Sequence, residues 1–287
     1  MQGLPGEYQL WKCDHCQTVF LHPVPEHIES LYPEDYQPYS VSKPQGKLAT
    51  WLYARGLAKQ TRLVRAMTGL QGGTALDVGC AHGDFLATLR AKGWKVTGLE
   101  TNAKIAQEGQ ADHGLEMIID RFETAPLPQQ AFDLVTFWDV LEHLSDPRLA
   151  LKKAWEITRP GGWIMLSLPN PDSWEAGWFG TDWAGWDIPR HLWVFKLATI
   201  KNLLQAEGWE YRSHQTRRGR FFLLNLSLSY WVNHYHDGQP AWKAALRLAN
   251  TLLGRTLLWP YFEFVEAIGR GSILICAAQR MPTTRPS

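Results

Sequence analysis

The residues best suited to chemistry lie in one short stretch, where an apolar run ends in a carboxylate and a turn. Residues 76–85 read LDVGCAHGDF. Gly79 and Gly83 let the backbone approach a ligand that a Cβ atom would block. The start of the helix predicted after them offers unpaired N–H groups to a carboxylate. Asp77 beside the turn can face an ammonium group, so the stretch predicts a site for the amino-acid end of a ligand.

A second carboxylate, Glu100, ends the next predicted strand. A carboxylate there accepts hydrogen bonds from both hydroxyls of a ribose. The turn and Glu100 together predict an amino acid joined to a nucleoside, and S-adenosylmethionine (SAM) is such a molecule. A dinucleotide requires Gly-x-Gly-x-x-Gly against its pyrophosphate, which the spacing of Gly79 and Gly83 does not fit. An ordinary strand–turn–helix without a ligand is disfavoured, because several independent elements agree.

Strands and helices alternate around these two carboxylates. The predicted strands are residues 74–78, 94–100, 116–120, 132–138, 162–168, 209–215 and 272–279. The predicted helices are an amphipathic one within 44–69, and others over 84–93, 102–114 and 196–207. Strands separated by helices imply right-handed crossovers and a largely parallel sheet.

Three segments resemble motifs of class I SAM-dependent methyltransferases. LDVGCAHGDFL resembles their first motif, FDLVTFWDVLEHLSDP their fourth-strand motif, and TRPGGWIMLSLPN the segment entering their fifth strand. Residues 186–195 are similar to the "PRHL" element of a subgroup whose members often carry an N-terminal zinc ribbon. The resemblance implies an α/β, Rossmann-like fold, with a seven-stranded sheet in the order 3-2-1-4-5-7-6. Strand 7 is then antiparallel, and helices flank the sheet.

The resemblance also implies the positions that contact SAM. Asp77, Gly79 and Gly83 match positions lining the methionine end, Glu100 matches the ribose carboxylate, and Trp138 matches a position flanking the cofactor. The full set of predicted cofactor residues is Asp77, Gly79, Cys80, Gly83, Glu100, Thr101, Asp120 and Trp138.

Two positions depart from the family pattern. Ala81 stands where many members have glycine, a small change that retains binding. Many members also have an acidic residue after the third strand, near the adenine. Here the aligned residue is Arg121, with Asp120 one position earlier, so the adenine contact is the least defined part of the predicted site.

Two histidines are predicted on the acceptor side, His143 and His191. Methyl transfer is an in-line displacement, helped mainly by holding acceptor and methyl in line. A hydroxyl acceptor must also lose its proton, and histidine is the usual base near pH 7. For His143 a structural role in a turn is an equal alternative; for His191 the catalytic role is slightly favoured. Asp139, Glu142 and His143 also resemble the acidic–histidine set of quinone-type O-methyltransferases, but the sequence is common in the fold and we predict no metal.

Five of the 15 tryptophans fall between residues 174 and 193. They lie in segment 169–195, which follows the fifth strand and is predicted as a lid over the carboxyl ends of the strands, where ligands bind. The segment is interpreted as the wall of a pocket for an apolar, aromatic or glycosyl acceptor. A packed cover for the sheet edge is the alternative.

The N-terminal segment, residues 1–43, contains Cys13-x-x-Cys16. This is half of a zinc site, because a structural zinc needs four ligands, usually two such pairs. No second pair follows, so either the site has decayed or the true start lies further upstream. We predict a partial zinc-ribbon-like segment, and a methyltransferase domain over 44–280.

Residues 221–268 are predicted as a helical insertion before the last strand, broken near Pro240. A helical cap on the core or on a second subunit is favoured. The alternative is an amphipathic surface that leans on a membrane to reach a lipid-soluble acceptor, and the few Lys and Arg residues make it the weaker one.

The composition limits partners and location. The net charge is +1, from 29 Lys and Arg against 28 Asp and Glu, so no nucleic-acid partner is expected. Four cysteines form no disulfide framework. The N-terminus lacks the regions of a signal peptide, and no run of about 18 apolar residues exists. We therefore expect a cytoplasmic protein of undetermined oligomeric state.

These observations predict a SAM-dependent methyltransferase acting on a small molecule, with oxygen favoured as the methylated atom. Methylation of nucleic-acid bases is disfavoured, because residues 137–140 read FWDV in place of Asn/Asp-Pro-Pro-aromatic. Two other classes are weighed against this prediction. One is a non-catalytic SAM-fold interaction protein, and the other is a nicotinamide-dependent oxidoreductase, which the glycine spacing disfavours.

Overall fold

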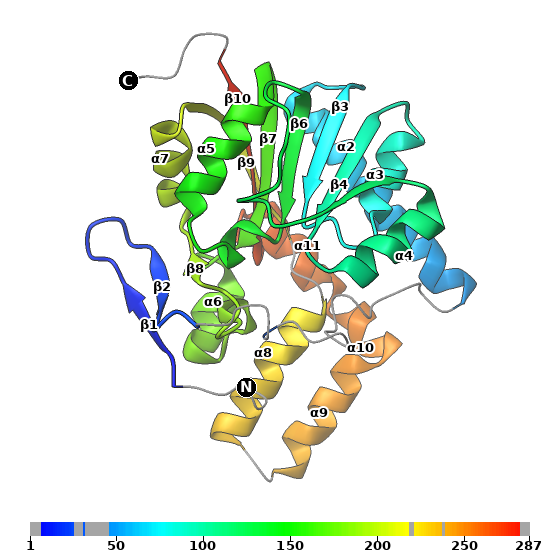
Figure 1. The fold of residues 1–287 in the computed structure, drawn as a ribbon. Coiled ribbons are helices and arrows are strands. Elements are labelled where there is room, and N and C mark those ends of the chain that lie inside the picture. The colour runs from blue at the N-terminus through cyan, green and yellow to red at the C-terminus, as the bar shows by residue number, and fades with distance from the viewer. Residues whose placement is uncertain (1–6, 26–30, 32–45, 218–220, 237–238, 282–287) are drawn as a thin grey trace. The chain divides into compact units, whose positions relative to one another are not determined.

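Seven strands form one mixed sheet in the computed structural model, which describes residues 7–25, 31, 46–217, 221–236 and 239–281 (Figure 1). The sheet confirms the predicted order and the antiparallel seventh strand. From one edge to the other the strands are β5 (Glu116–Ile119), β4 (Lys95–Glu100), β3 (Thr74–Val78), β6 (Phe132–Trp138), β7 (Thr158–Pro169), β10 (Ile273–Arg280) and β9 (Trp209–Arg217).

Its contacts divide the chain into two compact units. We call residues 26–166, 201–213 and 276–287 the core unit, and residues 1–25, 167–200 and 214–275 the helical unit. The boundaries predicted from sequence, 1–43 and 44–280, are a different partition and stay a prediction. No helix among the described residues combines the length and apolarity needed to cross a membrane.

The core unit holds the parallel strands and the helices that connect them. The helices are α2 (Lys47–Thr68), α3 (Asp84–Arg90), α4 (Ala103–His113) and α5 (Pro147–Ile157). Strands β3 and β6 are almost wholly buried, which explains their near-continuous apolar sequences, since a parallel sheet is covered on both faces. Helix α7 (Leu197–Ala206) precedes β9.

Helix α5 was not among the predicted helices, although its start carries a clear signal. Asp146 accepts a hydrogen bond from the backbone N–H of Leu149 at 2.9 Å, and Pro147 occupies the first turn. An aspartate cap followed by proline is a typical helix start, because proline lacks the N–H that the first turn leaves unpaired anyway. The predicted helix over 102–114 carries both a start and a stop signal. Asn102 caps its first turn, and Gly114 ends it in the left-handed conformation.

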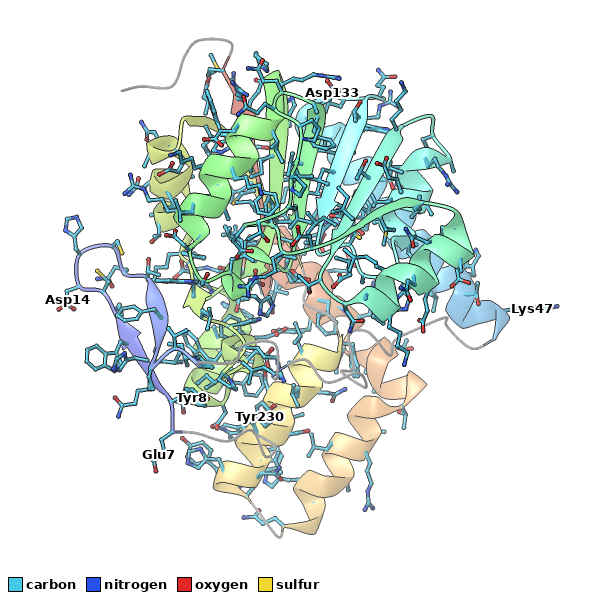
Figure 2. The ribbon with its side chains drawn as sticks, in the orientation of Figure 1. Glu7, Tyr8, Asp14, Lys47, Asp133 and Tyr230 are labelled. Carbon is cyan, nitrogen blue, oxygen red and sulfur yellow. The ribbon has the colours of Figure 1, made fainter. Side chains whose placement is uncertain are left out.

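At the amino-terminal edge of the sheet, the Asp133 side chain joins three strands. Its Oδ2 accepts hydrogen bonds from the Thr74 backbone N–H and from Arg159 Nη1, both at 2.8 Å (Asp133 is labelled in Figure 2). Gly73 leaves room for this side chain, because a Cβ there would lie 2.7 Å from the same oxygen. The starts of β3, β6 and β7 are thereby held together, on the edge opposite the predicted cofactor residues.

The helical unit contains a small sheet and the helices after residue 167. Strands β1 (Gln9–Lys12), β2 (Val19–His22) and β8 (Trp193–Val194) form an antiparallel sheet of their own. The helices are α6 (Trp174–Phe179), α8 (Phe221–Tyr235), α9 (Pro240–Asn250), α10 (Leu252–Leu257) and α11 (Trp259–Ala267). The described part of residues 221–268 contains α8 to α11.

Arg280 is a buried cation that the sequence analysis did not single out. Its Nη1 donates to the carbonyl oxygens of Trp155 and Thr158, and its guanidinium carbon lies 3.6 Å from the centroid of the Trp155 ring. Only 6% of Arg280 is exposed. It therefore ties β10 to the end of α5 and the start of β7.

We expect Arg280→Leu to lower the free energy of unfolding by about 2–4 kcal/mol, because buried carbonyls lose their donor and a cation–π contact is lost. Chemical denaturation measures the change. Arg212→Leu is the control, since Arg212 is exposed on β9 and its loss should cost under about 0.5 kcal/mol. Equal effects of the two substitutions would contradict the role of Arg280.

Candidate functional site

The carboxyl ends of four parallel strands bring the predicted cofactor residues to one edge of the sheet. Strand β3 pairs in parallel with β4 and β6, and β4 pairs in parallel with β5. Each of these strands ends at or just before a predicted residue. The residues at this edge are Asp77, Gly79, Cys80, Gly83, Glu100, Thr101, Asp120 and Trp138.

Glu100 links the turn after β3 to the turn after β4. Its Oε2 accepts from the Ala81 backbone N–H and its Oε1 from the Asn102 backbone N–H, both at 3.0 Å. The Thr101 hydroxyl lies 3.3 Å from Oε1. Only 3% of Glu100 is exposed. A carboxylate has about four acceptor positions, so at least one remains for a ribose hydroxyl.

Asp77 is also buried, and its contacts are few. Its Oδ1 accepts from the Thr136 hydroxyl at 2.6 Å, across the paired strands β3 and β6. Burial raises the pKa of Asp77 to about 7, the hydrogen bond from Thr136 opposes the rise, and the charge of Glu100 adds to it. A cationic group beside Asp77 would favour the ionised form. Two buried carboxylates at one edge therefore suit a ligand that brings an ammonium and a pair of hydroxyls.

The backbone of the turn explains its glycines differently from the sequence analysis. Gly79 and Gly83 have φ values of 68° and 77°, in the left-handed region. A Cβ atom would lie 2.6 Å from Val140 Cγ2 at Gly79, and 2.5 Å from Leu115 Cδ1 at Gly83. Both glycines are thus required by backbone conformation and by neighbouring side chains. The sequence analysis attributed both glycines to the close approach of a ligand. The structure instead shows that protein side chains occupy the space that a Cβ atom would take.

Two non-glycine residues at this edge also adopt the left-handed conformation. Ala81, after β3, has φ 48°, and Asp139, after the neighbouring β6, has φ 57°. Such residues cost about 1–3 kcal/mol each, persist only where the surroundings hold them, and cluster at ligand sites. For Ala81 the holding contact is its hydrogen bond to Glu100.

Cys80 faces the protein interior. Its Sγ lies 3.8 Å from Met117 Sδ, and burial raises the pKa of its thiol. Its backbone N–H donates to the Leu99 carbonyl at 3.2 Å.

Asp120 stabilises its own turn, because its Oδ1 accepts from the Arg121 backbone N–H at 2.7 Å and from the Thr124 hydroxyl at 2.9 Å.

Trp138 carries a buried donor that points to a ligand. Its indole Nε1 is buried and donates to no acceptor among the described residues. The ring packs edge-on against Phe85, with ring centroids 5.5 Å apart. Since buried polar groups are nearly always paired, an unpaired indole N–H at the edge that holds Asp77 and Glu100 fits a bound molecule.

The two predicted histidines lie in different units, His143 in the core unit and His191 in the helical unit. His143 is half-buried in a short 3₁₀ turn after β6, where its backbone N–H donates to Val140 at 3.0 Å. In the helical unit, His191 Nδ1 lies 2.8 Å from the Gly185 carbonyl oxygen. A carbonyl only accepts, so Nδ1 carries the proton and Nε2 of a neutral His191 is an acceptor.

The tryptophan-rich segment is more regular than a loop. It contains α6, two 3₁₀ turns and β8. Trp183 is buried in a cluster with Ala176 and Val194, whereas Trp178 is 63% exposed. Part of the segment is therefore packed cover within the helical unit; the acceptor-wall interpretation stays a prediction for the exposed tryptophans.

Gly109 is a residue at this site that the sequence analysis missed. A Cβ atom there would lie 2.5 Å from the His82 carbonyl oxygen, so glycine lets α4 pack directly on the turn after β3. A glycine inside a helix costs about 1 kcal/mol relative to alanine, and this unfavourable placement was the available signal in the sequence.

Asp84, at the start of α3, was missed as well. Its Oδ2 accepts from the Tyr53 hydroxyl at 2.8 Å, and its Oδ1 lies 2.9 Å from His113 Nε2.

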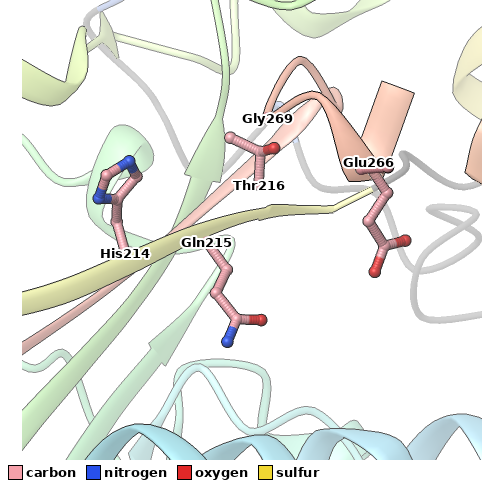
Figure 3. A pocket seen from close by; sticks show the side chains of 6 residues that line it. His214, Gln215, Thr216, Glu266 and Gly269 are labelled. Atoms are coloured by element: carbon pink, nitrogen blue, oxygen red, sulfur yellow. The ribbon is translucent and has the colours of Figure 1, made fainter. Parts of the chain in front are cut away.

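A cavity of about 300 Å³ lies in the helical unit, between β9 and the end of α11. Figure 3 shows His214 and Gln215 projecting from opposite sides of the strand, with Glu266 reaching in from the helix. None of the predicted site residues lines it, and we assign it no role.

The comparisons with known proteins agree with this geometry. Residues 51–214 match the profile of the methyltransferase domain family, and the chain belongs to that family. It is a SAM-dependent methyltransferase, and SAM is its cofactor. The assignment of Asp77 to the ammonium of SAM and of Glu100 to its ribose stays a prediction.

Three individual similarities set the scale. The chain is 26% identical over 174 residues to a ubiquinone biosynthesis O-methyltransferase of Sodalis glossinidius, covering 55% of this chain and 70% of that protein. It is 30% identical over 130 residues to the protein of the same name from Bordetella avium, covering 42% and 54%. A solved SAM-dependent methyltransferase of Thermotoga maritima, described as a possible histamine N-methyltransferase, has a TM-score of 0.56 at 15% identity and covers 88% of this chain and 98% of that one; it shows the fold.

The raised pKa of Asp77 predicts how SAM binding depends on pH. Only the ionised carboxylate attracts the ammonium of SAM, so below about pH 7 affinity should fall about tenfold per pH unit. Asp77→Asn should bind SAM more weakly and lose this dependence. Calorimetric titration from about pH 5.5 to 7.5 measures both, with Glu210→Gln as an exposed control.

The raised pKa of Asp77 also predicts how the stability of the ligand-free protein depends on pH. SAM affinity should rise with pH, whereas the stability contributed by Asp77 should fall. A folded-state pKa above the unfolded value means that the native state holds its proton longer, so the contribution of Asp77 to stability falls as pH rises from about 4 to about 7. Asp77→Asn should therefore gain stability relative to wild type at pH 8 compared with pH 5. A constant difference would contradict the raised pKa.

The strained Ala81 gives a second prediction for the turn. Ala81→Gly should raise the free energy of unfolding by about 0.5–1 kcal/mol, because glycine adopts the left-handed region without penalty. Ala87→Gly, within α3, is the matched control and should lower it by about 1 kcal/mol. Thermal unfolding measures both. Destabilisation by Ala81→Gly would show that Ala81 is not strained.

Proposed function

We propose that this methyltransferase acts on a hydroxyl group of a small apolar acceptor. The observation that carries the cofactor part of the proposal is the pair of buried carboxylates, Asp77 and Glu100, at the carboxyl edge of the sheet. The choice of oxygen is supported by the relatives named ubiquinone biosynthesis O-methyltransferase, although the chain spans only about half to 70% of the lengths of the first two.

Each residue at the edge then has a positioning task. SAM supplies a methyl group on a positively charged sulfur. Asp77 holds the ammonium end, Glu100 holds the ribose, and the Trp138 N–H offers one further hydrogen bond. Fixing both ends of the cofactor fixes the direction of the methyl group, which is where most of the acceleration of an in-line displacement arises.

For the proton of the acceptor hydroxyl, we propose His191 as the base and His143 as a second candidate. The bond between Nδ1 of His191 and Gly185 supports the choice, because it fixes the ring and leaves Nε2 as the acceptor. The Asp187–Arg190 ion pair holds the turn that presents this ring. In this proposal residues 186–195 are the PRHL element of the resembling subgroup, and its function is to place His191.

A separate proposal concerns the hairpin of β1 and β2 near the N-terminus. Cys13 and Cys16 are near each other in the turn between β1 and β2, where the Cys13 N–H donates to the Thr18 carbonyl at 2.9 Å. Such a turn is what half of a zinc ribbon contributes, and no third ligand joins the pair among the described residues. We propose that residues 1–43 are a partial zinc-ribbon-like segment and 44–280 the methyltransferase domain, in a cytoplasmic protein.

The test combines cofactor binding with turnover. We expect Glu100→Gln to weaken SAM binding at least about tenfold, since hydrogen bonds to a charged carboxylate are lost. Glu210→Gln, on β9 and paired there with Arg212, should leave it unaltered. Transfer from methyl-labelled SAM is then followed with apolar phenols and with anilines of the same shape.

Histidine variants separate the base from the binding residues. His191→Asn should lower kcat toward phenols by about 10²–10⁴ while leaving SAM affinity unaltered, and His143→Asn should have the smaller effect. Methylation of anilines but not of phenols would overturn the choice of oxygen. Unaltered turnover in both histidine variants would overturn the assignment of the base.

A further inference from the structure

A cavity of about 270 Å³ lies within the core unit, where the end of α2, the segment before β3 and the end of α3 meet. Two of the residues that line it, Leu70 and Trp94, precede β3 and β4 along the chain. The cavity therefore lies at the amino-terminal edge of the parallel strands, opposite the edge that holds Asp77 and Glu100. We call it the basic cavity, because of the charges described below.

Apolar side chains form one side of the basic cavity. They are Val64 from α2, Leu70, Leu89 from α3 and Trp94. Val64, Leu89 and Trp94 are buried, with Trp94 only 5% exposed. Packing against the protein interior holds these side chains in place, so the apolar side exists before a ligand binds. A pocket with an apolar lining and a few polar groups is the usual form of a small-molecule site.

Three cations line the same cavity, Arg62 and Arg65 from α2 and Lys92 after α3. Arg62 and Arg65 are three residues apart, so they are neighbours on one face of the helix. All three residues are exposed. Among the described residues, no carboxylate forms an ion pair with any of them, and no acidic residue lines the cavity. Their charges are thus available to an anion.

The segments around the basic cavity carry charge of one sign. Residues 47–76 contain five Lys and Arg and no Asp or Glu, and residues 85–99 contain three and none. The whole chain has 29 basic and 28 acidic residues, so eight cations are grouped where the chain has no acid. Asp133, at the same edge of the sheet, is already paired with Arg159. Such a grouping attracts anions to the cavity.

We infer that the basic cavity binds a phosphate monoester that carries a small apolar group. A phosphate monoester has a charge of about −1.5 to −2 at pH 7 and three strong acceptor oxygens, which suits three cations better than the single charge of a carboxylate. Arginine donates to phosphate in pairs of hydrogen bonds. The apolar group contacts Trp94 and Leu70. This site is separate from the predicted cofactor residues, so it does not depend on the proposed acceptor.

Calorimetric titration of the full chain tests the inference, with S-adenosylhomocysteine present throughout so that a probe cannot occupy the cofactor site. Phenyl phosphate is the probe. Inorganic phosphate lacks the apolar group, benzoate has one negative charge, and benzamide has none. We expect phenyl phosphate to bind, inorganic phosphate and benzoate each to bind about tenfold or more weakly, and benzamide to show no binding.

Variants locate the site. Arg62→Ala and Arg65→Ala should each weaken the binding of phenyl phosphate about tenfold, because charge-assisted hydrogen bonds are lost. Arg55→Ala is the matched control: Arg55 is an exposed cation of the same helix that contacts the Trp51 ring and does not line the cavity. Its loss should leave phenyl phosphate binding unaltered. Each variant should bind S-adenosylhomocysteine as wild type does, which checks the fold.

Four results would overturn the inference. The first is wild type that does not bind phenyl phosphate. The second is equal affinity for phenyl phosphate and inorganic phosphate, since the anion is then attracted to the surface without use of the apolar side. Equal affinity for benzoate would contradict the choice of phosphate. An equal loss of affinity in Arg55→Ala would show that the charge of α2 as a whole, and not the cavity, attracts the probe.

Discussion

The structure of the site depends on a buried carboxylate that bonds to two backbone turns at once. Glu100 accepts from Ala81 after β3 and from Asn102 after β4, so the ends of these two strands are held to one another. Its hydrogen bonds to backbone N–H groups offset the cost of placing a carboxylate inside the protein. Among the described residues, Asp77 accepts a side-chain hydrogen bond from the Thr136 hydroxyl alone, and burial keeps its pKa raised to about 7.

The sheet follows from local rules, which is why so much of it could be predicted. Short apolar runs that end in glycine or in a carboxylate, with amphipathic segments between them, leave few arrangements once crossovers are right-handed. Asp77 and Glu100 could be assigned from sequence because each needs only to end its strand. Helix α5 was not predicted, although its Asp146-Pro147 start is an equally local signal.

Contacts between distant residues were beyond that reasoning. The sequence around Gly79 does not reveal that Val140 packs against it. The sequence around Gly109 does not reveal the His82 carbonyl. Yet these contacts explain why each position is glycine. Arg280 likewise reads as a cation in a tail until β10 brings it onto Trp155. The acceptor side was least accessible from sequence, because His143 and His191 belong to separate units, and the local contacts that hold each one do not reveal an acceptor.

The contacts of Asp77 and Glu100 have a consequence for the end of the catalytic cycle. In the proposed roles, Asp77 holds the ammonium and Glu100 the ribose, and both groups are present in SAM and in the S-adenosylhomocysteine left after transfer, so neither carboxylate would distinguish spent cofactor from fresh. On that proposal the product keeps both contacts, and discrimination would rest on the lost charge at sulfur. Turnover in a cell then follows the ratio of the two molecules rather than the concentration of SAM alone.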